Sequence, residues 1–252
     1  MLKKRIIPLV QLKGSSIVKT IQFKNPRIVG DAISTVKVFS NRMADEMIIT
    51  DIEATKNNLI NFRLLKRMTE ECIMPITIGG GIRTEKDVEK LFRIGADKIL
   101  INTQFYKDPT FIKKISKIYG KQSIVFSLDV AKVNNSEFIP FSMSGSINEK
   151  MTISDTIKKA IDCGFGELFL NVITRDGMMN GFELELIKKV SKLINIPLVV
   201  AGGCSKKEDF ASEMLKKYKD LILVDYGFHY HGDTTESGDD DNWFLLKKNK
   251  SL

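Results

Sequence analysis

The segment IMPITIGGGIRT, residues 73–84, has the pattern of a buried strand that ends in a glycine-rich turn and is followed at once by a helix. A similar segment, NIPLVVAGGCSK, occupies residues 195–206, about 120 residues later. A strand joined to a helix by a short turn is the repeating unit of parallel α/β folds. The recurrence therefore predicts an α/β fold that contains a duplicated unit.

Two further pairs of segments repeat at nearly the same distance. ADEMIITDI (44–52) is similar to FGELFLNVI (165–173), and ADKILIN (96–102) is similar to KDLILVD (219–225). Three pairs that share one offset indicate two fused halves. Under this alignment Gln11 lies opposite Asp129 across a pseudo-two-fold axis.

Eight β-branched runs alternate with amphipathic segments along the chain. Strands are predicted at 5–11, 46–52, 74–80, 97–102, 123–129, 167–172, 196–202 and 221–225. Helices are predicted near 30–43, 57–72, 84–95, 108–119, 152–163, 182–194, 205–218 and 240–249. This arrangement predicts a (β/α)8 TIM barrel, built from two fused half-barrels, as a single domain over residues 1–252. The alternative is a doubly wound open sheet, which would carry a glycine-rich first turn.

Two long segments interrupt the regular alternation. Residues 12–29 and 131–151 follow the first and fifth predicted strands, which are related by the duplication. We expect both to be loops that act as lids or binding loops, because connections this long on a compact barrel usually do so.

Composition limits the classes of function. The 252 residues are 43% hydrophobic, and no apolar run approaches the length of a membrane span, so we expect a cytoplasmic protein without membrane contact. The net charge of +8 suits anionic small molecules or an acidic partner, whereas no motif indicates nucleic-acid binding. Three scattered cysteines indicate neither disulfides nor zinc, and His229 and His231 have no clear third ligand. We expect no metal and no cofactor.

Charged residues stand at the beginnings of four predicted strands. Side chains alternate between the two faces of a strand, so these residues share a face with polar residues at the opposite ends of the strands. The four are Arg5, Glu46, Lys98 and Glu167. Charges inside a barrel floor must be paired. The residues alone leave two interpretations open, a stabilising plug and a gated polar opening.

Glycines end two symmetry-related strands. Gly79, Gly80 and Gly81 precede one helix, and Gly202 and Gly203 precede its counterpart. Glycine lets backbone N–H groups approach an anion at a helix N-terminus. A phosphate site is one interpretation of each turn, and a bare tight turn is the other.

Together these segments resemble the cyclase subunit of imidazole glycerol phosphate synthase, the HisF family, over essentially the full length. The resemblance is carried by KRIIP (4–8), ADE…TDI (44–52), PITIGGGIRT (75–84), GADKILINT (95–103), TRDGMMNG (174–181), AGG (201–203) and FH (228–229).

The resemblance implies a barrel that binds a substrate with a phosphate at each end. It also implies a glutaminase subunit on the N-terminal floor, whose ammonia crosses the barrel to the mouth. The residues that match the family pattern are Arg5, Glu46, Lys98 and Glu167 as the ammonia gate; Asp129, Lys19 and Asp51 as catalytic or mouth residues; Gly80, Gly81, Asn102 and Thr103 at the first phosphate; and Asp176, Gly177, Gly202 and Gly203 at the second.

The mouth departs from the family pattern. The carboxylate that the family carries on its first strand is Gln11 here, and a primary amide cannot exchange a proton near neutral pH. The family's threonine on strand six is Asn171, and its serine on strand seven is Ala201. Near the second phosphate site the chain has Asp225 and Tyr226 in place of small neutral residues.

An unchanged floor below an altered mouth favours a diverged paralogue. We expect a barrel that receives ammonia from a glutaminase and supplies it for amidination of a surface-polysaccharide sugar, together with a sugar amidotransferase. An authentic cyclase of histidine biosynthesis, acting on a small phosphorylated substrate, is the first alternative. A non-catalytic scaffold for a glutaminase is the second.

Overall fold

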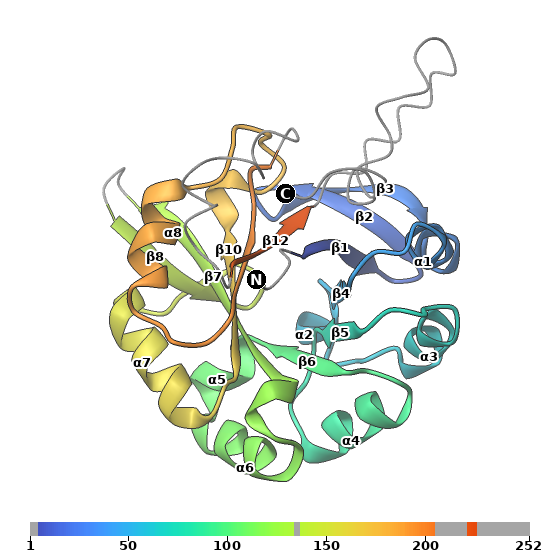
Figure 1. Ribbon diagram of the computed structural model, residues 1–252, viewed down its shortest axis with the longest axis horizontal. Helices are drawn as coiled ribbons and strands as arrows, with labels where there is room; N and C mark the ends of the chain where they lie inside the picture. Colours follow the sequence, from blue (N-terminus) through green and yellow to red (C-terminus); the bar gives the residue numbers. More distant parts are fainter. Residues whose placement is uncertain (1–4, 134–136, 205–220, 226–252) are drawn as a thin grey trace.

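The protein is a closed barrel of eight parallel strands (Figure 1). The computed structural model describes residues 5–133, 137–204 and 221–225. The barrel strands are β1 (Ile6–Lys13), β4 (Met47–Asp51), β5 (Ile76–Gly79), β6 (Lys98–Ile101), β7 (Ile124–Val133), β10 (Glu167–Val172), β11 (Leu198–Ala201) and β12 (Leu221–Asp225). Each pairs in parallel with the next, β12 pairs with β1, and β10 pairs with β7. The ring is therefore complete.

Helices surround this barrel (Figure 1). They are α1 (Ala32–Asn41), α2 (Ala54–Asn57), α3 (Phe62–Glu70), α4 (Glu85–Arg93), α5 (Thr103–Lys107), α6 (Pro109–Tyr119), α7 (Ile153–Cys163) and α8 (Leu184–Ser191), with single 3-10 turns η1 (Lys121–Ser123) and η2 (Ile173–Arg175). In the described ranges, no helix combines the length and the apolar character that crossing a bilayer requires.

Local sequence explains where the helices begin. Thr84 and Asp87 form a reciprocal capping box at α4, in which each side chain accepts a backbone N–H at the first turn. Asp108 accepts from the N–H groups of Thr110 and Phe111, and Pro109 opens α6 with a backbone that lacks an N–H. These signals are local, so the helix starts are readable from the sequence.

All eight predicted strands are present, and the six predicted helices that lie in the described part of the chain are present as well. The short helices α2 and α5 were not predicted, because four or five residues are too few to display a helical period. The helices predicted near 205–218 and 240–249 lie outside the described residues.

The two long interruptions form β-strands, so the prediction of loops was wrong, whereas their role as lids or binding segments stays a prediction. After β1 the chain forms an antiparallel pair, β2 (Ser16–Ile21) and β3 (Lys24–Asp31), and β2 also pairs with β1. After β7 it forms β8 (Glu137–Ser142) and β9 (Ile147–Asn148), again antiparallel. β1 and β7 each continue past the barrel rim, and each pairs there with the strand that returns toward the barrel. The two halves therefore carry equivalent β extensions above the mouth.

Hydrophobic side chains form two separate cores. The larger lies between the strands and the surrounding helices. The smaller lies inside the barrel and consists of Ile7, Leu9, Ile48, Leu100, Val125, Phe169, Val199 and Ala201. Alternate residues of one strand thus face opposite cores, as a closed barrel requires.

Glycine permits the same close approach in each half. A Cβ on Gly80 would stand 2.4 Å from the carbonyl oxygen of Asp51, and one on Gly202 would stand 2.7 Å from that of Val172. Both glycines have positive φ, at 107° and 98°. The glycine turns after β5 and β11 therefore pack on the ends of the preceding barrel strands β4 and β10 in an equivalent way, as the duplication predicts.

Candidate functional site

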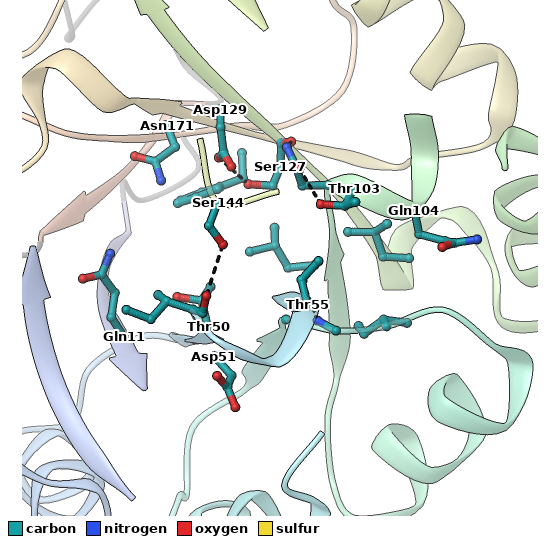
Figure 2. Close-up of a pocket in the computed structure, with 18 of the residues that line it drawn as sticks. Gln11, Thr50, Asp51, Thr55, Thr103, Gln104, Ser127, Asp129, Ser144 and Asn171 are labelled. Carbon is teal, nitrogen blue, oxygen red and sulfur yellow. Dashed lines mark hydrogen bonds between the residues drawn. The ribbon is translucent and has the colours of Figure 1, made fainter. Parts of the chain in front are cut away.

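A cavity of about 180 Å³ opens at the C-terminal ends of the barrel strands (Figure 2). This is the end at which TIM-barrel proteins carry their functional groups. Its lining includes polar residues from both halves, namely Gln11, Thr20, Thr50, Asp51, Thr55, Asn102, Thr103, Gln104, Ser127, Asp129, Ser144 and Asn171. Backbone from Gly80 and Gly81 and the side chains of Arg83 and Lys107 complete the rim on the first-half side.

Asp129 is the acidic group deepest in this cavity. It lies on β7 with only 7% of its surface exposed, and Ser127 donates a hydrogen bond of 2.9 Å to its Oδ1. Burial raises the pKa of Asp129 to about 7; the Ser127 hydroxyl opposes this rise and the charge of Asp176 adds to it. A carboxyl group with a pKa near 7 can both accept and return a proton at neutral pH.

Gln11 occupies the opposite side of the mouth on β1. Its side chain is 4% exposed, and its Oε1 lies 3.3 Å from the hydroxyl of Thr20 on β2. In Figure 2 the amide nitrogen atoms of Gln11 and Asn171 are both turned toward the gap between the two side chains. The arrangement offers hydrogen-bond donors in a place where a second carboxylate would offer a base.

Asn102 and Thr103 tie the second β extension to the mouth. Asn102 Nδ2 donates to the carbonyl oxygens of Ser127 and Phe141, each at 3.0 Å. Thr103 Oγ1 donates to Asn102 Oδ1 at 3.2 Å and accepts from the N–H of Met143 at 3.0 Å. Both residues line the cavity, but their polar atoms bind the protein itself, so a phosphate would have to compete with these bonds.

The first glycine turn has a similar arrangement. The N–H of Gly81 donates to Thr55 Oγ1 at 3.2 Å. Asp51 uses Oδ1 to accept from the N–H groups of Glu53 and Ala54, both at 3.0 Å, which fixes the chain after β4. Burial raises the pKa of Asp51 despite these two donors.

The turn between β8 and β9 crosses the mouth. Ser144 donates to the carbonyl oxygen of Ile52 at 3.2 Å, a contact drawn in Figure 2 between residues 92 positions apart. Ser144 and Met143 both have positive φ, near 55° and 51°. A Cβ on Gly145 would lie 3.1 Å from the ring of Phe23, which lines the cavity from the β2–β3 turn. The two β extensions thus form a joint roof.

Five other residues predicted for the site are not among those that line the cavity, namely Lys19, Asp176, Gly177, Gly202 and Gly203. Lys19 is on β2 and pairs with Arg27 of β3 in the sheet register. Asp176 is fully buried beneath the β2–β3 turn, and Gly177 packs where a Cβ would stand 2.3 Å from the carbonyl oxygen of Thr20. Gly202 and Gly203 are buried behind β10 and η2. Asp225 is the last residue of β12, and Tyr226 and both histidines lie outside the described residues.

Thr20, Phe23 and Ser144 line the cavity but were not predicted. All three belong to segments that were interpreted as loops, where no strand parity was applied. Ser127 shares its parity with Asp129, and that parity was the signal that could have identified it. Within the described ranges, no cluster of three or more histidine, cysteine, aspartate or glutamate side chains could hold a metal ion.

At the opposite end of the barrel, the four predicted floor residues form one connected series of ion pairs. Arg5 pairs with Glu46, Lys98 Nζ lies 3.4 Å from Glu46 Oε2, and the same Nζ lies 2.6 Å from Glu167 Oε2. The two carboxylates are almost fully buried, Lys98 is mostly buried and Arg5 is partly exposed. We call this series, which alternates in charge and sums to zero, the floor ladder.

An apolar layer separates the floor ladder from the mouth. Leu9, Leu100 and Phe169 belong to the inner core and also line the mouth cavity from below. The barrel therefore has three levels along its axis, which are an ionic floor, an apolar middle and a polar mouth.

Comparison with known proteins agrees with this architecture. The model of the family described as "Histidine biosynthesis protein" matches residues 5–234. A Campylobacter jejuni protein provisionally named imidazole glycerol phosphate synthase subunit hisF2 is 40% identical over 230 residues, covering 91% of each chain. A Pseudomonas aeruginosa protein with the same provisional name is 34% identical, covering 92% of this chain and 93% of the relative.

A relative without the provisional qualifier supports the same assignment. The imidazole glycerol phosphate synthase subunit HisF of Alkaliphilus metalliredigens is 31% identical over 232 residues, covering 92% of each chain. The barrel, the mouth cavity and the family match point to one conclusion: the chain belongs to the histidine biosynthesis protein family and, within it, to the HisF group.

Proposed function

We propose that this barrel receives ammonia from a glutaminase subunit at its floor and conducts it to the mouth, where it is handed to an acceptor other than the substrate of the ordinary cyclisation. The observation that supports this proposal is the contrast between the floor and the mouth of the barrel. The floor ladder is complete, whereas the β1 position of the mouth holds Gln11 rather than a carboxylate.

The three levels of the barrel suit transfer of a small neutral base. Ammonium would meet Lys98 at the floor and an apolar layer above it, and both disfavour a cation. Neutral ammonia can accept a hydrogen bond from Lys98 and can enter the apolar layer at much lower cost, because it carries no charge. The floor ladder would then act as a gate whose ion pairs open and reclose.

The floor also offers apolar side chains for a partner. Met43, Ile73 and Leu193 lie in connections that lead into β4, β5 and β11, at the floor end of the barrel, and all three are exposed. Ile73 is the most exposed of them, at 80%. A subunit that covered these side chains would place its own product next to the floor ladder.

The docking test uses tagged chain recovered from its native cell and assays the eluate for glutamine hydrolysis. Ile73→Asp should abolish the recovered glutaminase activity, because it places a charge in the apolar contact. Ile28→Asp is the matched control, since Ile28 is also highly exposed but belongs to β3 above the mouth. Equal glutaminase activity with both variants would refute docking at the floor.

The acceptor belongs to the same proposal. With Gln11 and Asn171 at the mouth, the barrel supplies ammonia for amidination of a surface-polysaccharide sugar, together with a sugar amidotransferase. The test reconstitutes the barrel, its glutaminase and the candidate amidotransferase with labelled glutamine, and follows the label into the sugar. Label that enters the sugar equally well without the barrel would contradict this role.

Authentic cyclisation remains the second candidate, and Asp129 favours it. Its carboxyl group lines the cavity with a pKa of about 7, as an acid–base catalyst requires. The two candidates separate in one assay, in which purified barrel is mixed with the substrate of imidazole glycerol phosphate synthase and an ammonium salt. Negligible turnover supports the diverged role, and robust turnover supports the cyclase.

A further inference from the structure

Three buried side chains, Gln11, Thr20 and Asp176, are in contact one after another. The first two line the mouth cavity, and the third ends in a carboxyl group that does not line it. Thr20 Oγ1 lies 2.6 Å from Asp176 Oδ2 and 3.3 Å from Gln11 Oε1. Thr20 and Gln11 line the cavity, whereas Asp176 is fully buried behind them. The three residues come from β2, β1 and the end of η2, so only the folded barrel brings them together.

One hydroxyl proton cannot serve two acceptors at once. Thr20 lies between a carboxyl oxygen and an amide oxygen, and its hydroxyl has a single hydrogen to donate. If Thr20 donates to Gln11 Oε1, then the short contact to Asp176 requires Asp176 to carry a proton and donate it to Thr20. If Asp176 is ionised, Thr20 must donate to it, and the facing end of Gln11 is then best filled by the amide nitrogen.

The surroundings of Asp176 make its protonation easier than that of an exposed carboxyl group. Its Oδ1 is buried and accepts no hydrogen bond, a placement that costs less for a neutral acid than for a carboxylate. Its Oδ2 accepts from the N–H of Phe23 at 3.0 Å. Burial raises the pKa of Asp176, and the contacts from Thr20 and Phe23 offset only part of that rise.

Few charged groups face this carboxyl group. Asp129 on β7 is an acidic neighbour, and the negative charge that Asp176 carries when it is ionised raises the pKa of Asp129. Arg175 precedes Asp176 in the chain, but its guanidinium binds Glu183 and the carbonyl oxygen of Asn180 instead. Among the residues that the structure describes, no lysine or arginine forms an ion pair with Asp176, so only the Thr20 and Phe23 donors offset the burial of its charge.

We propose that the proton on Asp176, acting through Thr20, sets which end of the Gln11 amide faces the cavity, so that Asp176 and Thr20 are positioning residues for a donor in the mouth. With the proton present, the sequence of bonds runs from Asp176 to Thr20 and from Thr20 to Gln11 Oε1, and the amide N–H₂ group faces the cavity. When the proton leaves, Thr20 donates to Asp176 and the amide turns its carbonyl oxygen toward the ligand.

This arrangement specifies the chemistry of the ligand group at that position. The amide nitrogen of Gln11 is turned into the gap between Gln11 and Asn171 (Figure 2), in the cavity that Asp129 also lines. Amide N–H groups bind acceptor oxygens and offer nothing to a cationic group. The β1 side of the mouth therefore selects a carbonyl-type oxygen. This inference does not depend on whether the barrel conducts ammonia.

The test follows two side chains by NMR in the uniformly labelled full-length chain. The carboxyl carbon signal of Asp176 reports its protonation, and the side-chain N–H₂ signals of Gln11 report the amide. As pH rises through the titration of Asp176, the Gln11 signals should shift with the same midpoint. Thr20→Val keeps the side-chain shape and removes the hydroxyl, so it should raise the pKa of Asp176 further and uncouple the Gln11 signals from it.

Thr50→Val is the matched control. Thr50 also lines the cavity and lies beside Gln11 in the register of β1 with β4, but it is not one of the three side chains in contact. In Thr50→Val, the Gln11 signals should still shift with the same midpoint as the titration of Asp176. Gln11 signals that ignore the titration of Asp176 in the unmodified chain, or that follow it equally well in Thr20→Val, would overturn the proposal.

A small probe checks the ligand class independently. N,N-dimethylacetamide has a carbonyl oxygen and no N–H donor, whereas methylammonium has donors and no acceptor. At a pH where Asp176 is protonated, the first should shift the Gln11 amide signals and the second should not. The first shift should weaken at least several-fold in Thr20→Val. A response to methylammonium alone would overturn the assignment of a donor site.

Discussion

Lys98 Nζ lies 2.6 Å from Glu167 Oε2, although the two residues are 69 positions apart in the chain. Both stand at the first residue of a barrel strand, β6 and β10, and neither strand neighbours the other in the sheet. The ion pair therefore crosses the inside of the barrel. Through Glu46 it extends to Arg5, so a single lysine connects carboxylates from both halves of the duplicated fold.

Removing that lysine should destabilise the barrel strongly. Lys98→Met keeps the length of the side chain but leaves Glu46 and Glu167 buried without their shared cation, and losing one partner of a buried ionic cluster costs about 3–5 kcal/mol. Lys66→Met is the control, because it breaks only the exposed pair with Glu70, worth about 0.5 kcal/mol or less. Urea unfolding of both variants measures the difference. Equal losses would show that the floor ladder contributes nothing beyond a surface pair.

Restoring a carboxylate at the mouth tests the reason for the diverged role. Gln11→Asp returns an acid–base group to β1, opposite Asp129, and a positioned group of this kind is worth about 10²- to 10⁴-fold in rate. We expect turnover of the imidazole glycerol phosphate synthase substrate with ammonium salt to rise by at least the lower figure. Gln11→Asn, which shortens the side chain equally without adding a charge, should give no increase. A similar gain from both variants would assign the effect to space rather than to acid–base chemistry.

The pKa of Asp129 predicts a pH dependence of stability. Because burial raises this pKa from 3.8 to about 7, the folded protein holds a proton that the unfolded chain has lost, and stability falls as pH rises between those values. The unmodified protein should therefore lose roughly 4 kcal/mol of unfolding free energy between pH 4 and pH 8, since the shift spans about three pKa units and each is worth about 1.4 kcal/mol. Asp129→Asn should remove this loss. Urea unfolding at the two pH values measures it. An unchanged pH dependence would contradict the buried acid.

Ser127 should tune the same carboxyl group. Its hydroxyl donates to Asp129 Oδ1 at 2.9 Å and thereby favours the ionised form. Ser127→Ala should therefore raise the pKa of Asp129 above about 7, as read from the carboxyl carbon signal during a pH titration. Ser144→Ala serves for comparison, since Ser144 lines the cavity but donates to Ile52 instead. A fall in the pKa of Asp129 in Ser127→Ala would contradict the conclusion that Ser127 stabilises the ionised form.

The glycine turn after β5 should not tolerate a side chain. Gly80→Ala places a Cβ 2.4 Å from the carbonyl oxygen of Asp51, in a backbone conformation that L-residues rarely adopt. We expect a loss of about 2–4 kcal/mol in the free energy of unfolding, which combines overpacking with backbone strain. Gly14→Ala carries the strain of positive φ but meets no atom within 4 Å, so its loss should stay near 1 kcal/mol. Comparable losses of unfolding free energy in the two variants would mean that the structure around Gly80 accommodates the added Cβ by a small shift.

The floor was readable from the sequence because strand parity is a strong local rule. Arg5, Glu46 and Glu167 each begin a predicted strand, Lys98 is the second residue of another, and alternation places all four on the inner face. The sequence did not provide the order of contacts, in which Lys98 serves both glutamates and Arg5 reaches only Glu46. Which side chains meet depends on strand stagger and barrel closure, and neither is encoded locally.

The mouth was less predictable for a related reason. Gln11 and Asp129 were predicted for the mouth and line the cavity. Thr20, Phe23 and Ser144 also line it but were not predicted, because the segments that carry them were interpreted as loops. Their strands form only by pairing with the protruding ends of β1 and β7. An edge of this kind exists only after the barrel has closed, so the local sequence gives a weak signal for it.

The sequence by itself determined the barrel, its duplication, the position of the charged floor and the exchange of a carboxylate for Gln11, because periodicity, repeats and residue identity are properties of short segments. Only the tertiary structure decided that Asp176 lies buried behind Thr20 and Gln11, and that the β8–β9 turn spans the mouth to Ile52. These contacts join residues from different strands and from both halves. Their geometry is set by how the closed sheet brings distant segments together, and no single segment contains that information.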